Sequence, residues 1–198
     1  MKSKGSLIAV IVVLVLVVWA VGAGIKANNN MVTKDEAVKT SWSQVENQYQ
    51  RRADLIPNLV NTVKGYATHE KETLEGVINA RAKATQTTVD PTNLTPEAMQ
   101  EYMAAQGELS QALGRLMVTV EQYPDLKANE NFLALQSQLE GTENRITTER
   151  RRFNEVSKDY NTYIRTFPNS LFAGILGFDQ KPYFEAESGA EKAPTVEF

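Results

Sequence analysis

The stretch Asn129–Phe167, NENFLALQSQLEGTENRITTERRRFNEVSKDYNTYIRTF, decides the fold class of this chain. Large apolar side chains recur in it at alternating steps of three and four residues, which is the spacing of one face of an α-helix. The positions on this seam are Phe132, Leu135, Leu139, Thr142, Ile146, Glu149, Phe153, Val156, Tyr160, Tyr163 and Phe167. The pattern predicts one long helix from about Asn129 to Thr166 with a coiled-coil-like seam, ended by Phe167-Pro168.

The same spacing occurs upstream, on both sides of a proline. The repeated positions are Val38, Trp42, Val45, Tyr49, Arg52, Ile56, Leu59 and Val63. Their phase continues past Pro57, so we expect one helix with a kink rather than two helices. Thr33 with Glu36 matches a capping box, which predicts that this helix begins after a polar spacer at Ala27–Met31. Gly65 predicts its end.

Two shorter helices are expected between these long ones. The first runs from His69 to about Lys83, and a polar loop follows it. The second begins at Thr95-Pro96-Glu97, where a cap, a proline at the first helical position and an acid near the positive helix end favour a helix start. Tyr123-Pro124 ends that helix.

Four helices with short connections predict an all-α protein. We expect an N-terminal single transmembrane helix followed by an antiparallel (up-down) four-helix bundle with long helices. If residues 34–84 form one helix, the alternative is a three-helix rod. The expected domains are an N-terminal flank (1–6), a transmembrane anchor (7–25), the helical bundle (32–178) and an acidic, disordered tail (179–198).

Leu7–Ile25 is an uncharged apolar run that is long enough to cross a bilayer. As a helix it measures about 28 Å, close to the ~30 Å hydrocarbon core. The residues expected to hold it in lipid are Leu7, Ile11, Val15, Trp19 and Ile25. A cleaved signal peptide is the alternative, because Lys2 and Lys4 precede the run, but the run is longer than an ordinary signal core.

Charge and composition limit the partners. Lys2, Lys4 and Lys26 lie at the anchor, whereas all 24 Asp and Glu follow it, so residues 27–198 carry a net charge of about −6. An acidic body argues against nucleic acid as a ligand. The basic residues before the anchor favour a cytoplasmic amino terminus and a body outside the cytoplasm. The absence of cysteine excludes a lipoprotein anchor and disulfides.

The residues that catalysis or metal binding usually needs are missing. His69 is the single histidine, so the His-Glu-x-x-His zinc motif and the Glu-x-x-His pairs of di-iron bundles are incomplete. No nucleophile elbow and no glycine-rich phosphate loop occurs. We therefore expect no enzyme activity, no catalytic residues, no bound cofactor and no metal.

Charged residues on the apolar seams predict a buried ion pair. Arg52 and Glu149 occupy seam positions, and a charge there is costly unless it is paired. We expect Glu149 to meet Arg52 or Arg81, with the alternative that the helix ends splay and leave Glu149 in water. The basic cluster at Arg145 and Arg150–Arg152 is expected to pair with acids on a neighbouring helix.

Leu171–Phe178 is a short apolar segment after the long helix. Its large apolar residues are Leu171, Phe172, Ile175, Leu176 and Phe178. One interpretation is a cap on the open end of the helical core. The other is a surface that contacts the membrane or a partner.

Three blocks of the chain resemble the LemA family. The first block runs from Trp42-Ser43-Gln44-Val45-Glu46 through Tyr49–Val60 to Val63–Ala67, the second is Tyr123–Asn129 with Phe132 and Leu139, and the third holds Thr142–Ile146, Arg150-Arg151, Phe153-Asn154, Tyr160-Asn161 and Phe167-Pro168. The resemblance implies a bacterial protein with an N-terminal transmembrane helix and a helical-bundle domain, and the family is not recognised as enzymes. Its genes often lie near membrane-protease and envelope-stress genes.

These observations favour a non-enzymatic scaffold or adaptor in the bacterial inner membrane, anchored once and able to self-assemble. The expected partners are the lipid bilayer, a second copy of the chain and an unidentified membrane protein. One alternative is a lipid-binding or membrane-remodelling bundle that uses Leu171–Phe178. Another is an adaptor in membrane-protein quality control or envelope stress.

Overall fold

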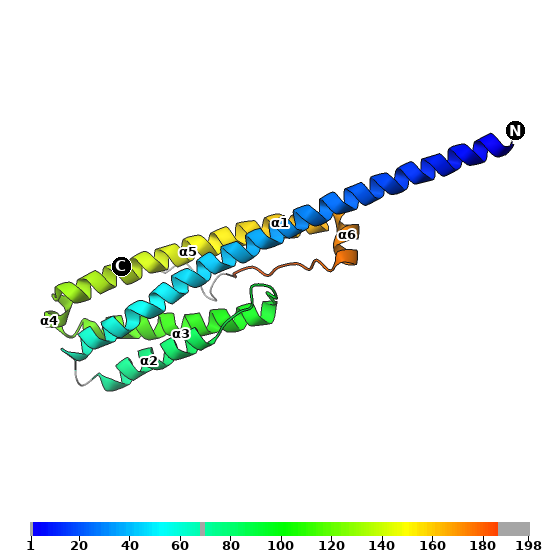
Figure 1. The fold of residues 1–198 in the computed structure, drawn as a ribbon. Helices are drawn as coiled ribbons and strands as arrows, with labels where there is room; N and C mark the ends of the chain where they lie inside the picture. Colours follow the sequence, from blue (N-terminus) through cyan, green and yellow to red (C-terminus); the bar gives the residue numbers. More distant parts are fainter. Residues whose placement is uncertain (1, 68–69, 186–198) are drawn as a thin grey trace, which may run out of the picture. The chain divides into compact units, whose positions relative to one another are not determined.

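The computed structural model describes residues 2–67 and 70–185, and these residues are helices joined by short connections, with no strand among them (Figure 1). The helices are α1 (Lys2–Lys64), α2 (Lys71–Gln86), α3 (Pro96–Val120), α4 (Pro124–Lys127), α5 (Glu130–Arg165) and α6 (Asn169–Leu176). The all-helical prediction is confirmed, as are the two long helices. Residues 34–84 divide between α1 and α2, so the single-helix alternative for that range is wrong.

α1 continues without a break from the apolar run into the polar part of the chain. The predicted spacer at Ala27–Met31 and the predicted helix start at Thr33 are wrong, because Thr33 donates its hydroxyl to the carbonyl of Asn29 inside the helix. Asparagine in a helix costs less than about 1 kcal/mol relative to alanine. Stopping and restarting a helix would require a new and costly nucleus. The helix also continues through Pro57, as expected.

The predicted starts of α3 and α5 are confirmed by their capping contacts. Thr95 accepts a hydrogen bond from the backbone N–H of Ala98, and Pro96 fills the first helical position. Asn129 accepts one from the backbone N–H of Phe132 at 3.0 Å. The sequence patterns missed two short helices, α4 and α6, which are too short for their periodicity to stand out.

The chain divides into two compact units. The first consists of the residues up to Thr40 together with Glu155–Lys181, and the second consists of Ser41–Asn154 and continues from Pro182. α1 and α5 contribute residues to both units.

Side chains from four long helices form one core in the second unit. α2 and α3 pack side by side in it (Figure 1). Its buried residues include Ile56, Leu59 and Val63 of α1, Leu74 and Val77 of α2, Leu109 and Leu116 of α3, and Phe132 and Leu139 of α5. The helical seams predicted from sequence supply these residues, because burial of that face is what stabilises an amphipathic helix.

An aromatic cluster lies beside this core and includes part of the predicted tail. Trp42 makes edge contacts with Tyr102 and Phe153 and stacks on Phe184 at 5.8 Å between ring centroids. Asn154 bonds both the N–H and the carbonyl of Phe184, at 2.8 and 2.9 Å. The start of the range 179–198 is therefore packed chain rather than a free tail, whereas residues 186–198 lie outside the described residues.

Candidate functional site

The apolar part of α1 is exposed along its length. The predicted anchor residues lie in this surface, and their side chains are all more than half exposed: Leu7, Ile11, Val15, Trp19 and Ile25. Among the described residues, α1 is the helix that is long and apolar enough to cross a membrane. An unpaired apolar surface of this size is unfavourable in water and favourable in lipid.

A second apolar surface lies in the first unit, on α6. The ring of Phe172 lies against α1 at Gly24, where an added Cβ would be 3.1 Å from the Phe172 ring. Ala173 is buried, whereas Leu171 and Ile175 are 59% and 81% exposed. α6 thus packs one face on the end of the apolar run and leaves its other face uncovered.

α6 ends at a left-handed residue that turns the chain back. Gly177 has φ of 75°, a conformation that costs glycine little, and its N–H bonds to the carbonyl of Ala173. Phe178 donates its N–H to the same carbonyl at 3.0 Å. The chain then returns as the extended segment Asp179–Lys181, which we call the return segment.

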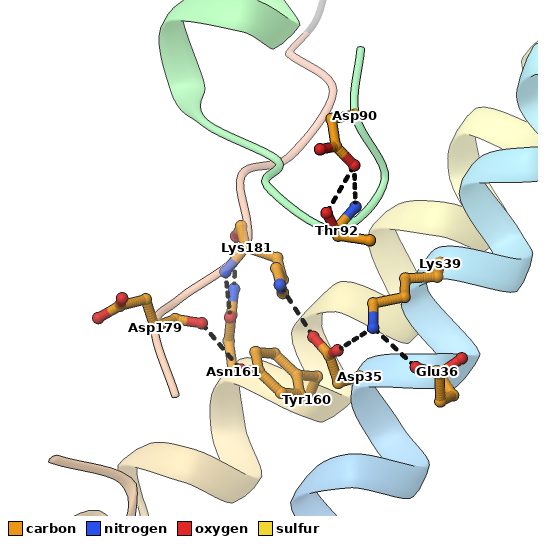
Figure 2. Close-up of polar contacts among 9 residues, drawn as sticks. All are labelled: Asp35, Glu36, Lys39, Asp90, Thr92, Tyr160, Asn161, Asp179 and Lys181. Atoms are coloured by element: carbon orange, nitrogen blue, oxygen red, sulfur yellow. Dashed lines mark hydrogen bonds and ion pairs between the residues drawn. The ribbon is translucent and has the colours of Figure 1, made fainter. Parts of the chain in front are cut away.

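Two neighbouring residues of α5 hold the return segment, as Figure 2 shows. Asn161 bonds both the N–H and the carbonyl of Lys181, each at 2.8 Å. Tyr160 donates its hydroxyl to the carbonyl of Asp179 at 2.9 Å. Burial, helped by the carboxylates of Asp35 and Asp179, raises the pKa of Tyr160 to about 12, so this donor keeps its proton at neutral pH.

A carboxylate on α1 completes the attachment (Figure 2). Lys181 lies 2.8 Å from Asp35, which also pairs with Lys39 at 2.9 Å. Burial by itself would raise the pKa of Asp35, but the hydrogen bonds from Lys181 and Lys39 outweigh it and place the pKa below its usual value. Hydrogen bonds from Lys39 to Asp35 and, to a smaller extent, to Glu36 raise the pKa of Lys39. The lowered pKa keeps Asp35 ionised at neutral pH, as the ion pair with Lys181 requires.

Further polar contacts join α1 to α5 in this unit. Lys34 pairs with Asp159 at 3.1 Å, and Asn30 donates to the hydroxyl of Tyr163 at 3.0 Å. The asparagine that sequence reasoning assigned to a spacer therefore contacts α5. These contacts position the end of α5, and through it the start of α6.

The predicted ion pair involves a different acid. Arg52 is 1% exposed and pairs with Glu143 at 2.8 Å, not with Glu149. The nearest cation to Glu149 among the recorded ion pairs is Arg152, one helical turn away at 3.9 Å. Sequence spacing marked Glu149 because it sits on the seam, but the flexible side chain of Glu143 reaches Arg52 from beside the seam.

Arg52 also bonds to neutral groups of α3. Its guanidinium donates to Ser110 at 2.8 Å and to the side-chain carbonyl of Gln106 at 2.7 Å. Gln106 in turn donates to the carbonyl of Ala84 in α2 at 3.1 Å. These bonds from the two terminal nitrogens offset part of the cost of burying the charge, while Nε has no hydrogen-bond partner among the described residues. Arg52, Gln106 and their partners therefore form a polar network that joins helices of the core.

Arg81 has a structural partner rather than an acid. Its Nε donates to the backbone carbonyl of Ala53 at 2.7 Å. That carbonyl is four residues before Pro57, which has no N–H to offer it. Arg81 thus supplies the hydrogen bond that the proline leaves unmade.

Sequence reasoning missed the role of two asparagines of α5 that bond the chain after α6. Asn154 and Asn161 bond the returning backbone in the second and the first unit, respectively. A signal was present, because an aromatic residue followed by asparagine occurs twice, at Phe153-Asn154 and Tyr160-Asn161, seven residues apart. Asp35 and Lys181 carried no comparable signal, since they are far apart in sequence.

Two further features concern possible ligand sites. Residues 2–67 and 70–185 contain no group of three or more His, Asp or Glu side chains placed to hold a metal, and His69 lies outside them. An open groove of about 610 Å³ lies between α3 and α5. It is lined by Ser110, Leu113, Gly114, Met117, Gln136, Leu139, Glu140, Glu143 and Asn144.

The fold defines an all-helical protein whose first helix is long and apolar enough to cross a membrane. The model of the LemA family matches residues 41–198. Magnetosome protein MamQ 2 of Paramagnetospirillum magneticum is 27% identical over 98% of this chain and 78% of its own length. Magnetosome protein MamQ of Magnetospirillum gryphiswaldense is 28% identical over 85% and 68%. Protein LemA of Metamycoplasma hominis is 24% identical over 80% and 68%. The chain belongs to the LemA family.

Proposed function

We propose that this protein is a self-assembling, non-enzymatic scaffold anchored once in the bacterial inner membrane. The observation that carries the proposal is the continuity of α1. This one helix contains the exposed apolar run and also contributes core residues to the second unit. One helix therefore contains both the segment proposed to cross the membrane and residues of the helical core.

A body outside the cytoplasm is part of the proposal. Lys2 and Lys4 precede the apolar run, and basic residues beside a span stay in the cytoplasm. Lys26 is the one basic residue directly beyond it. The balance favours a cytoplasmic amino terminus.

An antiparallel, up-down order of the four long helices in the second unit is also inferred. Hydrogen-bonded pairs support it, because the residue numbers of the partners rise along one helix as they fall along its neighbour. These pairs are Glu70–Tyr123 and Ala84–Gln106 for α2 with α3, and Arg52–Glu143 and Tyr66–Asn129 for α1 with α5.

The absence of enzyme activity is supported by chemistry and by the relatives. The terminal nitrogens of the buried Arg52 are occupied by hydrogen bonds to Ser110, Glu143 and Gln106. The names of the relatives, magnetosome protein and LemA, state no reaction. A lipid-binding bundle is the second candidate function, and the uncovered face of α6 favours it.

Light scattering on the full-length protein in mild detergent tests the scaffold. We expect a discrete assembly whose protein mass is a multiple of the 22.1 kDa chain, visible as uniform particles by electron microscopy. The mass should not change over a range of detergent concentrations, which controls for chains that merely share a micelle. A single-chain mass at all protein concentrations would contradict self-assembly and favour an adaptor.

A further inference from the structure

We propose that α6 is an interfacial membrane helix, which inserts its uncovered face into the leaflet at the carboxyl end of the apolar span. The inference rests on the proposed membrane anchor and adds a second point of contact between the protein and the same bilayer. The occupant of the apolar face is lipid.

The position of α6 along α1 is the first argument. Phe172 packs on Gly24, which lies in the last helical turn of the run Leu7–Ile25. At ~1.5 Å of rise per residue, this contact lies within a few ångströms of the end of the span. If the span is in the hydrocarbon core, α6 must lie at the boundary between hydrocarbon and headgroups.

The composition of α6 is the second argument. From Phe167 to Phe178 the chain has no charged residue. Leu171 and Ile175 are four residues apart, so they lie on the same face of the helix, and both are largely exposed. Eight residues of helix measure about 12 Å, too short to cross a bilayer and suited to lying at its surface.

The attachment of the return segment is the third argument. The bonds of Tyr160 and Asn161 and the ion pair between Lys181 and Asp35 fix the chain directly after α6. α5 fixes the chain directly before it. A short apolar helix that is held at both ends keeps its exposed face directed outward. The described protein of the same unit does not cover that face.

Lipid is favoured over a protein partner because the neighbouring surface is itself lipid-covered in the proposed topology. The contact of Phe172 with Gly24 places α6 beside the exposed apolar surface of α1, and Leu171 and Ile175 of the same short helix are exposed as well. A protein that covered α6 would have to displace lipid around the end of the span. A second copy of the chain is the competing occupant, and the experiment separates it.

The test uses the absence of cysteine in this chain. Single cysteines at Ile175, Leu14 and Lys158 are labelled with an environment-sensitive fluorophore in the full-length protein, reconstituted into vesicles of phosphatidylcholine and phosphatidylglycerol. Ile175→Cys reports on α6, Leu14→Cys on the middle of the span, and Lys158→Cys on an exposed site of α5 in the same unit. Lipids that carry a quencher near the headgroup are then added.

We expect blue-shifted emission at Ile175 with several-fold stronger quenching by the shallow lipid quencher than at Lys158, where the label stays in water. Leu14 should be quenched best by a quencher placed deep in the acyl chain. Water-like, unquenched emission at Ile175 with a quenched label at Leu14 would overturn the inference alone. An unquenched label at Leu14 would overturn the proposed anchor as well.

Emission at Ile175 that shifts to the blue as protein density rises, but is not quenched by the lipid quencher, would mean that a second copy of the chain covers α6. This result would overturn the inference. A second variant guards against an effect of the label itself. Leu171→Asp, combined with the label at Ile175, should move the emission toward that of the Lys158 control, with the helical signal in circular dichroism unchanged. Unchanged quenching in this variant would also count against membrane insertion.

Discussion

At the scale of single residues, Arg52 shows how a charge is accommodated in a helical core. Its guanidinium is buried, and its two terminal nitrogens bond one anionic group, Glu143, and neutral acceptors on α3, whereas its Nε has no hydrogen-bond partner in the part of the chain that the structure describes. Glu143 itself is nearly half exposed. The two partners therefore differ, because loss of the acid strands a buried charge, whereas loss of the arginine leaves an acid in water.

This asymmetry predicts a non-additive pair of substitutions. Glu143→Ala should lower the free energy of unfolding by about 2–4 kcal/mol, because the buried charge loses its anionic partner. Arg52→Met should cost about 1–2 kcal/mol for lost hydrogen bonds. The double variant should be no less stable than Glu143→Ala alone. Thermal unfolding of the full-length protein in detergent, followed by circular dichroism, measures all three.

Glu140→Ala is the matched control, since Glu140 is an exposed acid of α5 that bonds Gln136 on its own helix. Its effect should stay within about 0.5 kcal/mol. Additive losses in the double variant would show that Arg52 and Glu143 do not act as a pair.

Asp35 predicts a dependence of stability on pH. Its pKa is lowered in the folded protein, because the bonds from Lys181 and Lys39 outweigh the opposing effect of burial. The stabilisation is therefore fully present above the unfolded pKa of about 3.9 and is lost as the pH falls through the lower folded value. Asp35→Asn should reduce the melting temperature at pH 7, and the gap to the natural protein should narrow below about pH 4.

Glu36→Gln serves as the control, because Glu36 bonds the same lysine but is exposed. Its melting curve at pH 7 should lie close to that of the natural protein. A gap for Asp35→Asn that stays constant from pH 7 to pH 3 would contradict the assigned ion pairs.

At the scale of elements, α1 shows why residues that favour a helix end in isolation did not interrupt this helix. Asn28–Asn30 and Thr33 favour turns and caps in isolation. In α1 they lie between the apolar span and a buried seam, and Ala27 and Met31 are themselves buried. Because Ala27, Met31 and the seam beyond them are packed, the polar residues among them adopt the helical conformation as well.

Pro57 is the other apparent interruption of α1, and Arg81 compensates for it from α2. The carbonyl of Ala53 accepts the Arg81 bond in place of the missing backbone N–H. We expect Arg81→Met to cost about 1 kcal/mol in the natural protein and clearly less in a Pro57→Ala background, where a backbone N–H is restored. A double-mutant cycle by thermal unfolding measures this coupling.

Lys83→Met is a suitable control for the cycle, because Lys83 is exposed on α2 and pairs with Glu108 on α3. Its cost should be small and the same in both backgrounds. Equal costs of Arg81→Met in both backgrounds would mean that the arginine does not replace the proline's missing bond.

At the scale of the whole molecule, the chain combines a lipid-compatible helix with an acidic helical body. The charge of about −6 on residues 27–198 gives that body no broad attraction to anionic lipid. In the proposed arrangement, contact with the bilayer therefore depends on the exposed apolar surface of α1 and α6 in the first unit. The segments proposed to contact the membrane, Leu7–Ile25 of α1 and α6, accordingly contain no charged residue.

The amino-acid sequence by itself determined the all-helical class, the apolar span, the caps at Thr95 and the long seams of α1 and α5. These features follow from periodicity and from bonds between residues close along the chain, which one sequence contains. Only the tertiary structure decided that Glu143 rather than Glu149 meets Arg52, that Arg81 serves Ala53, and that Asp35 holds Lys181. Those choices depend on the register between helices and on the reach of long side chains, and both arise only when the helices pack.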